Sequence, residues 1–113
     1  MKIIMQSVTL NEIKAMAAAT FGNMVKAVVD VDRELIAVDA ELHSDLEALL
    51  LEDGSKQKNL WGINFYPEIN GDDFVEFDSM INMRPSQGNR SRGIENEEMR
   101  KKIIAIVAKR IKR

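Results

Sequence analysis

Apolar residues recur along the chain with two spacings, which separate the expected helices from the expected strands. In Thr9–Glu12 and Ser44–Glu47 a hydroxyl residue precedes a glutamate by three positions, the spacing of a capping box at a helix start. Apolar residues three or four positions apart follow both boxes, and they recur from Met99 to Ile111 behind a capping asparagine, Asn96. These patterns predict three helices.

Short apolar runs bounded by turn residues predict the strands. They are Lys2 to Met5, Met24 to Val31, Leu35 to Val38, Leu60 to Tyr66 and Phe74 to Met83. The element order is therefore β-α-β-β-α-β-β-α, and its two hairpins favour a largely antiparallel sheet. We expect an α+β fold with about five strands and three helices packed mainly on one side of the sheet.

The last expected strand has the clearest alternation of side chains, with apolar residues on one face. Its other face carries the polar groups Glu76, Asp78, Asn82 and Arg84. If Leu60–Tyr66 pairs with this strand, Trp61 faces the core and Gly62 leaves space on the polar face. Asn64 and Tyr66 then join that face. It is either a groove, whose acids bind a divalent cation and whose arginine holds an anion, or a solvated sheet surface with cross-strand ion pairs.

Length and composition are those of an ordinary globular protein. A chain of 113 residues has the size of one domain, so we expect a single domain over residues 1–113. The absence of cysteine excludes disulfides and thiolate chemistry and is compatible with the cytoplasm. No window approaches the ~20 apolar residues of a membrane helix. We therefore expect a soluble, cytoplasmic protein without a membrane partner.

The charges are unevenly distributed, although the net charge is only −2. Asp30–Asp53 holds nine acids against one base, and Arg84–Arg113 holds ten bases against three acids. Two interpretations remain open: the segments neutralise each other within one fold, or they leave a dipolar surface that favours a homo-oligomer. The basic segment lacks accompanying aromatic residues, so nucleic-acid binding is the least favoured function class.

The loop from Arg84 to Gly93 combines guanidinium, hydroxyl and amide groups with two glycines. Its candidate binding residues, with the asparagine just before it, are Asn82, Arg84, Ser86, Asn89, Arg90 and Arg92. Such groups, together with free backbone N–H groups, can wrap a phosphate. However, three glutamates follow closely and no P-loop pattern is present. The alternative is a mobile loop whose arginines pair with the acidic middle of the chain.

His43 is the only histidine, and it lies between Glu41 and Asp45 just before an expected helix. Beside a carboxylate it can act as a general base or a metal ligand, so the candidate catalytic set is Glu76, Asp78 and His43. Two acids and one histidine are a weak metal signal, and we assign neither a metal site nor a cofactor. The alternative is a surface histidine near a helix cap.

Two long segments carry a resemblance to a known family. They are Leu50–Gln57 continued by Leu60–Asn64, and Glu76–Arg92, and the similarity extends to Val25–Asp30 and Glu41–His43. In these segments the chain resembles a family of short prokaryotic proteins known only as a domain of unknown function. The resemblance covers nearly the whole chain, but it implies no activity and transfers no catalytic residue.

Three function hypotheses follow from these patterns. The favoured one is a small non-catalytic binding or interaction module that holds an anionic group or a partner segment with the arginines of the loop. The second is a small hydrolase, metal-assisted or not, that uses Glu76, Asp78 and His43. The third is a nucleic-acid-binding protein that uses the basic C-terminal segment.

Overall fold

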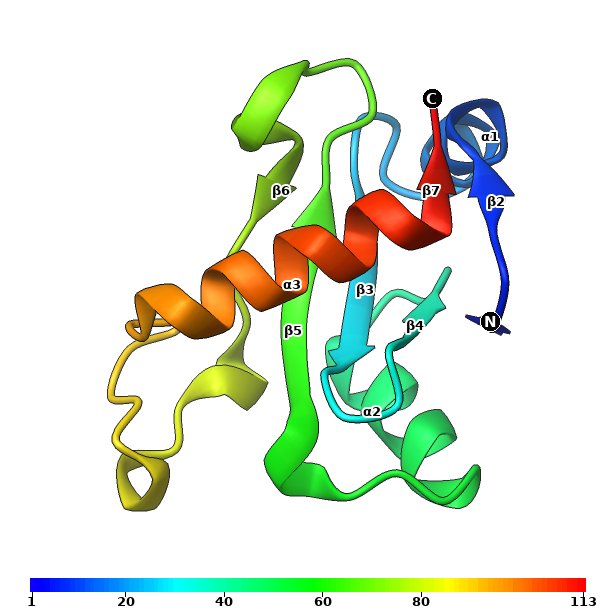
Figure 1. Ribbon diagram of the computed structural model, residues 1–113. Helices are drawn as coiled ribbons and strands as arrows, with labels where there is room; N and C mark the ends of the chain where they lie inside the picture. The colour runs from blue at the N-terminus through cyan, green and yellow to red at the C-terminus, as the bar shows by residue number, and fades with distance from the viewer.

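The computed structural model describes residues 1–113, and its centre is a five-stranded antiparallel sheet (Figure 1). The strand order is β1-β4-β3-β5-β6. The strands are β1 (Lys2–Ile4), β3 (Val25–Asp30), β4 (Leu35–Val38), β5 (Leu60–Phe65) and β6 (Val75–Glu76). Two further short strands, β2 (Val8–Thr9) and β7 (Ile111–Lys112), pair in parallel outside this sheet.

Three helices cover the sheet, two on one face and one on the other. They are α1 (Leu10–Ala19), α2 (His43–Glu52) and α3 (Glu97–Arg110). In Figure 1, α3 crosses in front of β3 and β5, whereas α2 lies behind the sheet. The predicted α+β class, with an antiparallel sheet of five strands and three helices, is confirmed.

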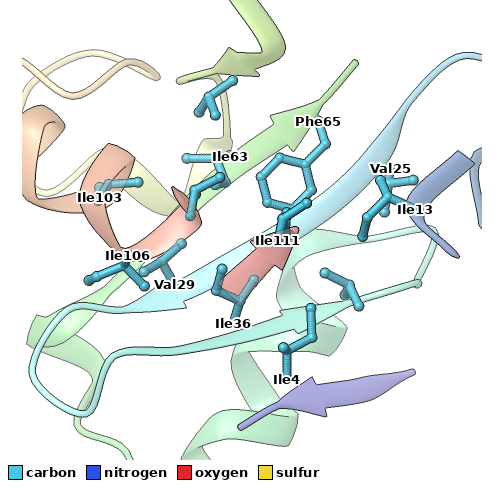
Figure 2. Packing of buried hydrophobic residues seen from close by; sticks show 14 of the residues in the cluster. Ile4, Ile13, Val25, Val29, Ile36, Ile63, Phe65, Ile103, Ile106 and Ile111 are labelled. Atoms are coloured by element: carbon cyan, nitrogen blue, oxygen red, sulfur yellow. The ribbon is translucent and has the colours of Figure 1, made fainter. Parts of the chain in front are cut away.

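The alternation of β3 explains why both faces of the sheet are covered. Val25 and Val29 point into a large cluster with side chains of α1 and α3, such as Ile13 and Ile103 (Figure 2). Val28 points the other way, into a smaller cluster with leucines of α2. Because successive side chains of a strand face opposite ways, a central strand that is apolar on both faces is buried between two layers.

Two of the three predicted helix starts are confirmed. Thr9 and Glu12 form a reciprocal capping box, with N–H···O distances of 3.1 and 3.2 Å. Asn96 accepts a hydrogen bond from the backbone N–H of Met99. The predicted box at Ser44 is wrong, because the N-cap of α2 is Leu42, two residues earlier, and it makes no side-chain cap. This start places the ring of His43 against the sheet, where it bonds the main chain of β5.

The predicted strand from Phe74 to Met83 is wrong beyond Glu76. The chain leaves the sheet after two paired residues and forms a turn at Met80–Asn82, whose start is capped by the Ser79 hydroxyl. Asn82 and Arg84 therefore do not share one strand face with Glu76. For the neighbouring strand, the prediction that Trp61 faces the core is confirmed, since Trp61 packs in the main cluster.

Candidate ligand-binding cavity

Two predicted binding residues, Asn82 and Arg84, seal the edge of β5 that β6 leaves open. The side-chain amide of Asn82 accepts from the N–H of Gly62 at 2.8 Å and donates to its carbonyl at 2.9 Å, as a neighbouring strand would. Arg84 donates to the carbonyls of Gln57 and Leu60. An unpaired strand edge exposes backbone groups that can pair with another chain. Here the side chains of Asn82 and Arg84 bond those groups instead.

Arg84 is buried, and its guanidinium is engaged on every side. Besides the carbonyls of Gln57 and Leu60, it donates to the carbonyl of Ile81 at 3.0 Å and stacks 4.5 Å from the ring centre of Trp61. Burial lowers the pKa of Arg84, because the charged form loses hydration. The donors that would hold an external anion are thus directed at the protein itself.

The loop that follows is held by Asn89 and Glu95. Asn89 is buried and donates to the carbonyls of Asn82, Ser91 and Gly93. Glu95 accepts the N–H groups of Arg90 and Ser91 at 2.6 and 2.9 Å, and these bonds lower its pKa. A protein carboxylate therefore occupies the backbone N–H groups that the sequence offered to a phosphate.

The other predicted residues of the loop lie at the surface. Ser86 is exposed in the turn Pro85–Gln87, and the side chain of Arg90 is exposed as well. Arg92 forms an ion pair with Asp78, with 2.8 Å between Nε and Oδ1. Of the loop arginines, only Arg92 reaches the cavity described next.

A cavity of about 410 Å³ opens between the start of α2 and the outer strands β5 and β6. Its charged and titratable lining residues come from five segments of the chain: Lys26, His43, Tyr66, Glu76, Asp78 and Arg92. Ser44, Asn64 and Ser79 add hydroxyl and amide groups. The three candidate catalytic residues, Glu76, Asp78 and His43, therefore lie in one cavity.

His43 sits in the wall of this cavity with a fixed orientation. Its Nε2 lies 2.8 Å from the carbonyl oxygen of Ile63. Because a carbonyl only accepts, we assign the proton of the neutral ring to Nε2, which leaves Nδ1 as an acceptor. Burial lowers the pKa of His43, and the charge of Lys26 adds to this effect, while Ile63, Asn64 and Asp78 oppose it. The ring is therefore neutral at pH 7.

Glu76 is held by neutral donors. Asn64 Nδ2 and the Tyr66 hydroxyl both donate to its Oε1, at 2.9 and 3.2 Å. Burial, followed by the charge of Glu76 and this hydrogen bond, raises the pKa of Tyr66, so the phenol remains a donor. The other carboxylate oxygen, Oε2, receives no hydrogen bond from the chain, and no Lys or Arg nitrogen lies within ion-pairing distance.

Asn64 is the most unusual member of the cavity wall. Only 4% of the residue is exposed, and its Nδ2 donates to Glu76 and to the carbonyl of Asp78. Its Oδ1 is buried and has no hydrogen-bond partner. A buried acceptor without a donor costs about 1–3 kcal/mol.

Apolar side chains form the rim of the cavity. Leu42 and Met80 line it with 55% and 64% of their surface exposed, and Met24 lies beside them. Large apolar residues with this exposure, placed around a polar floor, are typical of a site that covers the apolar part of a bound molecule.

Sequence reasoning brought together part of this site and missed the rest. Asn64 and Tyr66 were expected beside Glu76, and the register Asn64↔Glu76 places them there. The space expected at Gly62 is filled, because a Cβ there would lie 2.5 Å from that of Ser79. Lys26 also lines the cavity and was not among the predicted site residues. The one sequence feature that could have identified it is that it is the single lysine inside an apolar strand.

The structure also bears on the residues from which a metal site or a nucleic-acid-binding surface was considered. No group of three His, Asp or Glu side chains lies close enough together to hold a metal ion. The basic residues of α3 include Lys101 and Lys109, which pair with Glu98 and Glu34. None of the helices combines the length and apolar composition needed to cross a membrane.

Fold and cavity together define the class of protein: an α+β domain with a polar, apolar-rimmed cavity between α2 and the outer strands. A family model described as Protein of unknown function (DUF5674) matches residues 2–110. The chain belongs to this family, which confirms the resemblance to a domain of unknown function. Neither a curated protein nor a solved structure matches the chain.

Proposed function

We propose that this protein is a small binding module whose ligand site is the cavity beside His43. The observation that carries the proposal is a cavity wall that brings together the neutral ring of His43, the Oε2 oxygen of Glu76 that has no partner in the chain, and the ammonium group of Lys26. The size of the cavity, about 410 Å³, suits a small molecule. The ligand is therefore a small polar molecule with an apolar part.

This proposal moves the binding site away from the loop arginines. Arg84 and the backbone N–H groups of Arg90 and Ser91 already have partners within the chain. Of the polar residues expected on one strand face, Glu76 and Asp78 line the cavity. Arg92 of the loop lines it as well. A binding module with its site on the polar strand is still the function that we favour.

The test is an unbiased ligand screen by nuclear magnetic resonance. Amide resonances of the ¹⁵N-labelled protein are recorded with mixtures of amino acids, amines, carboxylates, sugars, nucleosides and inorganic phosphate. We expect at least one class to shift the resonances of residues 43–44, 62–66 and 76–81. A screen in which no class shifts these residues, or in which all shifts map elsewhere, would refute the proposal.

A matched pair of variants locates the site. Ser44 lines the cavity and Ser86 lies in the exposed turn of the loop. Ser44→Phe fills the cavity and should abolish binding, whereas Ser86→Phe should leave it unchanged. If Ser86→Phe is the variant that abolishes binding, the ligand belongs to the arginine loop and not to the cavity.

A hydrolase is the second candidate function, supported by one observation. His43, Glu76 and Asp78 line the same cavity, together with the hydroxyls of Ser44 and Ser79. It ranks second because Nε2 of His43 bonds a main-chain carbonyl and Asp78 is paired with Arg92, so no carboxylate orients the ring. Hydrolysis of chromogenic ester and phosphate substrates that disappears in His43→Gln would support it.

A further inference from the structure

Three side chains form a row across the floor of the cavity. Lys26 of β3 is directly opposite Asn64 of β5, and Asn64 is directly opposite Glu76 of β6. Directly opposed residues in an antiparallel pair project from the same face. Adjacent strands lie ~4.8 Å apart, so the first and last Cα atoms of the row are roughly 10 Å apart. The row presents a cation, an amide and an anion in order.

The two charges at the ends of this row have no partner of opposite charge. No carboxylate lies within ion-pairing distance of Lys26, whose Nζ instead lies 5.4 Å from the ring centre of Phe21. Glu76 is bonded only by the neutral groups of Asn64 and Tyr66. The other two charged residues of the cavity, Asp78 and Arg92, neutralise each other.

This pattern has an energetic consequence. Lys26 and Glu76 are both half-buried, and a charge that loses hydration without gaining a counter-charge is unfavourable. A ligand that brings a cation to Glu76 and an anion to Lys26 restores both. The neutral ring of His43 adds no charge to the site and offers Nδ1 as an acceptor.

From this row we infer that the cavity selects a small zwitterion, a molecule of the amino-acid class. Its ammonium group lies at Glu76 Oε2, its carboxylate lies at Lys26 Nζ, and its apolar part lies under Leu42 and Met80. This inference rests on the proposed function and adds the ligand class to it.

Four probes with five carbons test the inference by titration followed in amide resonances. Two are zwitterions, 5-aminopentanoate and norvaline, which differ in the distance between their charges. The other two, pentylamine and pentanoate, each carry one of the charges. We expect at least one zwitterion to bind about tenfold or more tighter than both singly charged probes, with shifts in residues 43–44, 62–66 and 76–81.

Two variants assign the two ends of the ligand. Glu76→Gln keeps the shape and the acceptor for Tyr66 but removes the charge, and it should weaken the zwitterion and pentylamine by about tenfold while sparing pentanoate. Lys26→Met keeps the aliphatic stem and should weaken the zwitterion and pentanoate while sparing pentylamine. Glu52→Gln and Lys112→Met, at exposed positions, are matched controls that should change nothing.

The outcomes separate this inference from the proposed function. Equal binding of a zwitterion and one singly charged probe overturns the inference and shows a plain amine or carboxylate site. Absence of binding for all four probes overturns it as well. In either case, if another compound class of the wider screen shifts the cavity residues, the cavity is still the ligand site. If no class shifts them, the proposed function and the zwitterion inference are both refuted. Thermal melting of each variant shows whether it is folded.

Discussion

At the scale of single residues, the chain places its one histidine where burial disfavours a positive charge. His43 is the first residue of α2, and only 8% of it is exposed. Its hydrogen bond to the carbonyl of Ile63 is made by the neutral ring and needs no charge. Burial therefore decides the protonation state, and the nearby Lys26 reinforces it.

The protonation of His43 should make stability depend on pH in a predictable direction. Its pKa in the folded state lies below the ordinary value of 6.5, so the unfolded chain binds this proton more readily. The free energy of unfolding should therefore fall as the pH falls below 6.5 and should level off below the folded pKa. Each unit of pKa difference corresponds to about 1.4 kcal/mol.

Urea unfolding at a series of pH values measures this dependence, with His43→Gln as the comparison. Glutamine can still donate to the carbonyl of Ile63 but does not titrate, so its curve should be flatter in this range. A titration of the ring resonances gives the folded pKa directly. A value at or above 6.5 would contradict the prediction.

At the scale of elements, a side chain takes the place of a strand. β6 ends after Glu76, and the next part of the β5 edge is closed by Asn82 and Arg84. Gly62 makes this possible, because the Cβ of any other residue would collide with Ser79. The residues that follow the end of β6, from Asp78 to Ile81, line the cavity together with Asn64 and Glu76. The early end of β6 and the cavity are thus one structural feature.

Removing the amide of Asn82 should destabilise the fold strongly. Asn82→Ala leaves the N–H and the carbonyl of Gly62 without partners in a buried place, and we expect a loss of about 2–4 kcal/mol in the free energy of unfolding. Urea unfolding measures it. Asn96→Ala, which removes an exposed helix cap, is the control and should cost about 1 kcal/mol. A loss for Asn82→Ala no larger than for this control would refute the structural role.

At the scale of the whole molecule, the two ends of the chain are joined. β7 follows α3 directly and pairs in parallel with β2, which precedes α1 (Figure 1). Ile111 is buried in the main cluster, and Arg110 donates to the carbonyls of Gln6 and Glu34. Segments about a hundred residues apart in sequence therefore stabilise each other.

The charge distribution belongs to the same scale. One ion pair, between Glu34 and Lys109, joins the acidic segment to the basic one. It lowers the pKa of Glu34 by a hydrogen bond and by the charge of Lys109. The remaining opposite charges of the two segments are not paired with each other, so a dipolar surface and the homo-oligomer expected from it stay predictions.

Cutting back Ile111 should weaken the whole fold and not only the C-terminus. Ile111→Ala removes buried surface from the main cluster and should cost about 2–4 kcal/mol in the free energy of unfolding. Ile69→Ala, at a side chain with 42% exposure, is the control and should change it by about 0.5 kcal/mol or less. Hydrogen exchange at residues 8–9 should accelerate with the first variant. Equal losses for both would show that β7 is dispensable.

The sequence predicted the elements better than it predicted the site. Leu35–Val38, the capping box at Thr9 and the N-cap at Asn96 follow from spacing alone, since they depend on near neighbours. Phe74–Met83 has the alternation of a strand, yet most of it is not one, because Asn82 bonds a residue twenty positions away. Pattern reasoning cannot see such a partner.

What the sequence determined by itself is the α+β class, the order of the three helices and of the five strands of the main sheet, and the family. Periodicity and caps are local, and the family match spans residues 2–110. The short strands β2 and β7 were not predicted, and Ile111 of β7 was expected in the last helix. What only the tertiary structure decided is the use of each polar residue. In the sequence, Arg84 and Asn89 belong to the favoured binding set and Glu76 to the candidate catalytic set. In the structure, Arg84 and Asn89 donate to main-chain carbonyls, whereas Glu76 lines the cavity. Lys26, His43 and Glu76 come together because strand pairing and the packing of α2 set distances that no local pattern encodes.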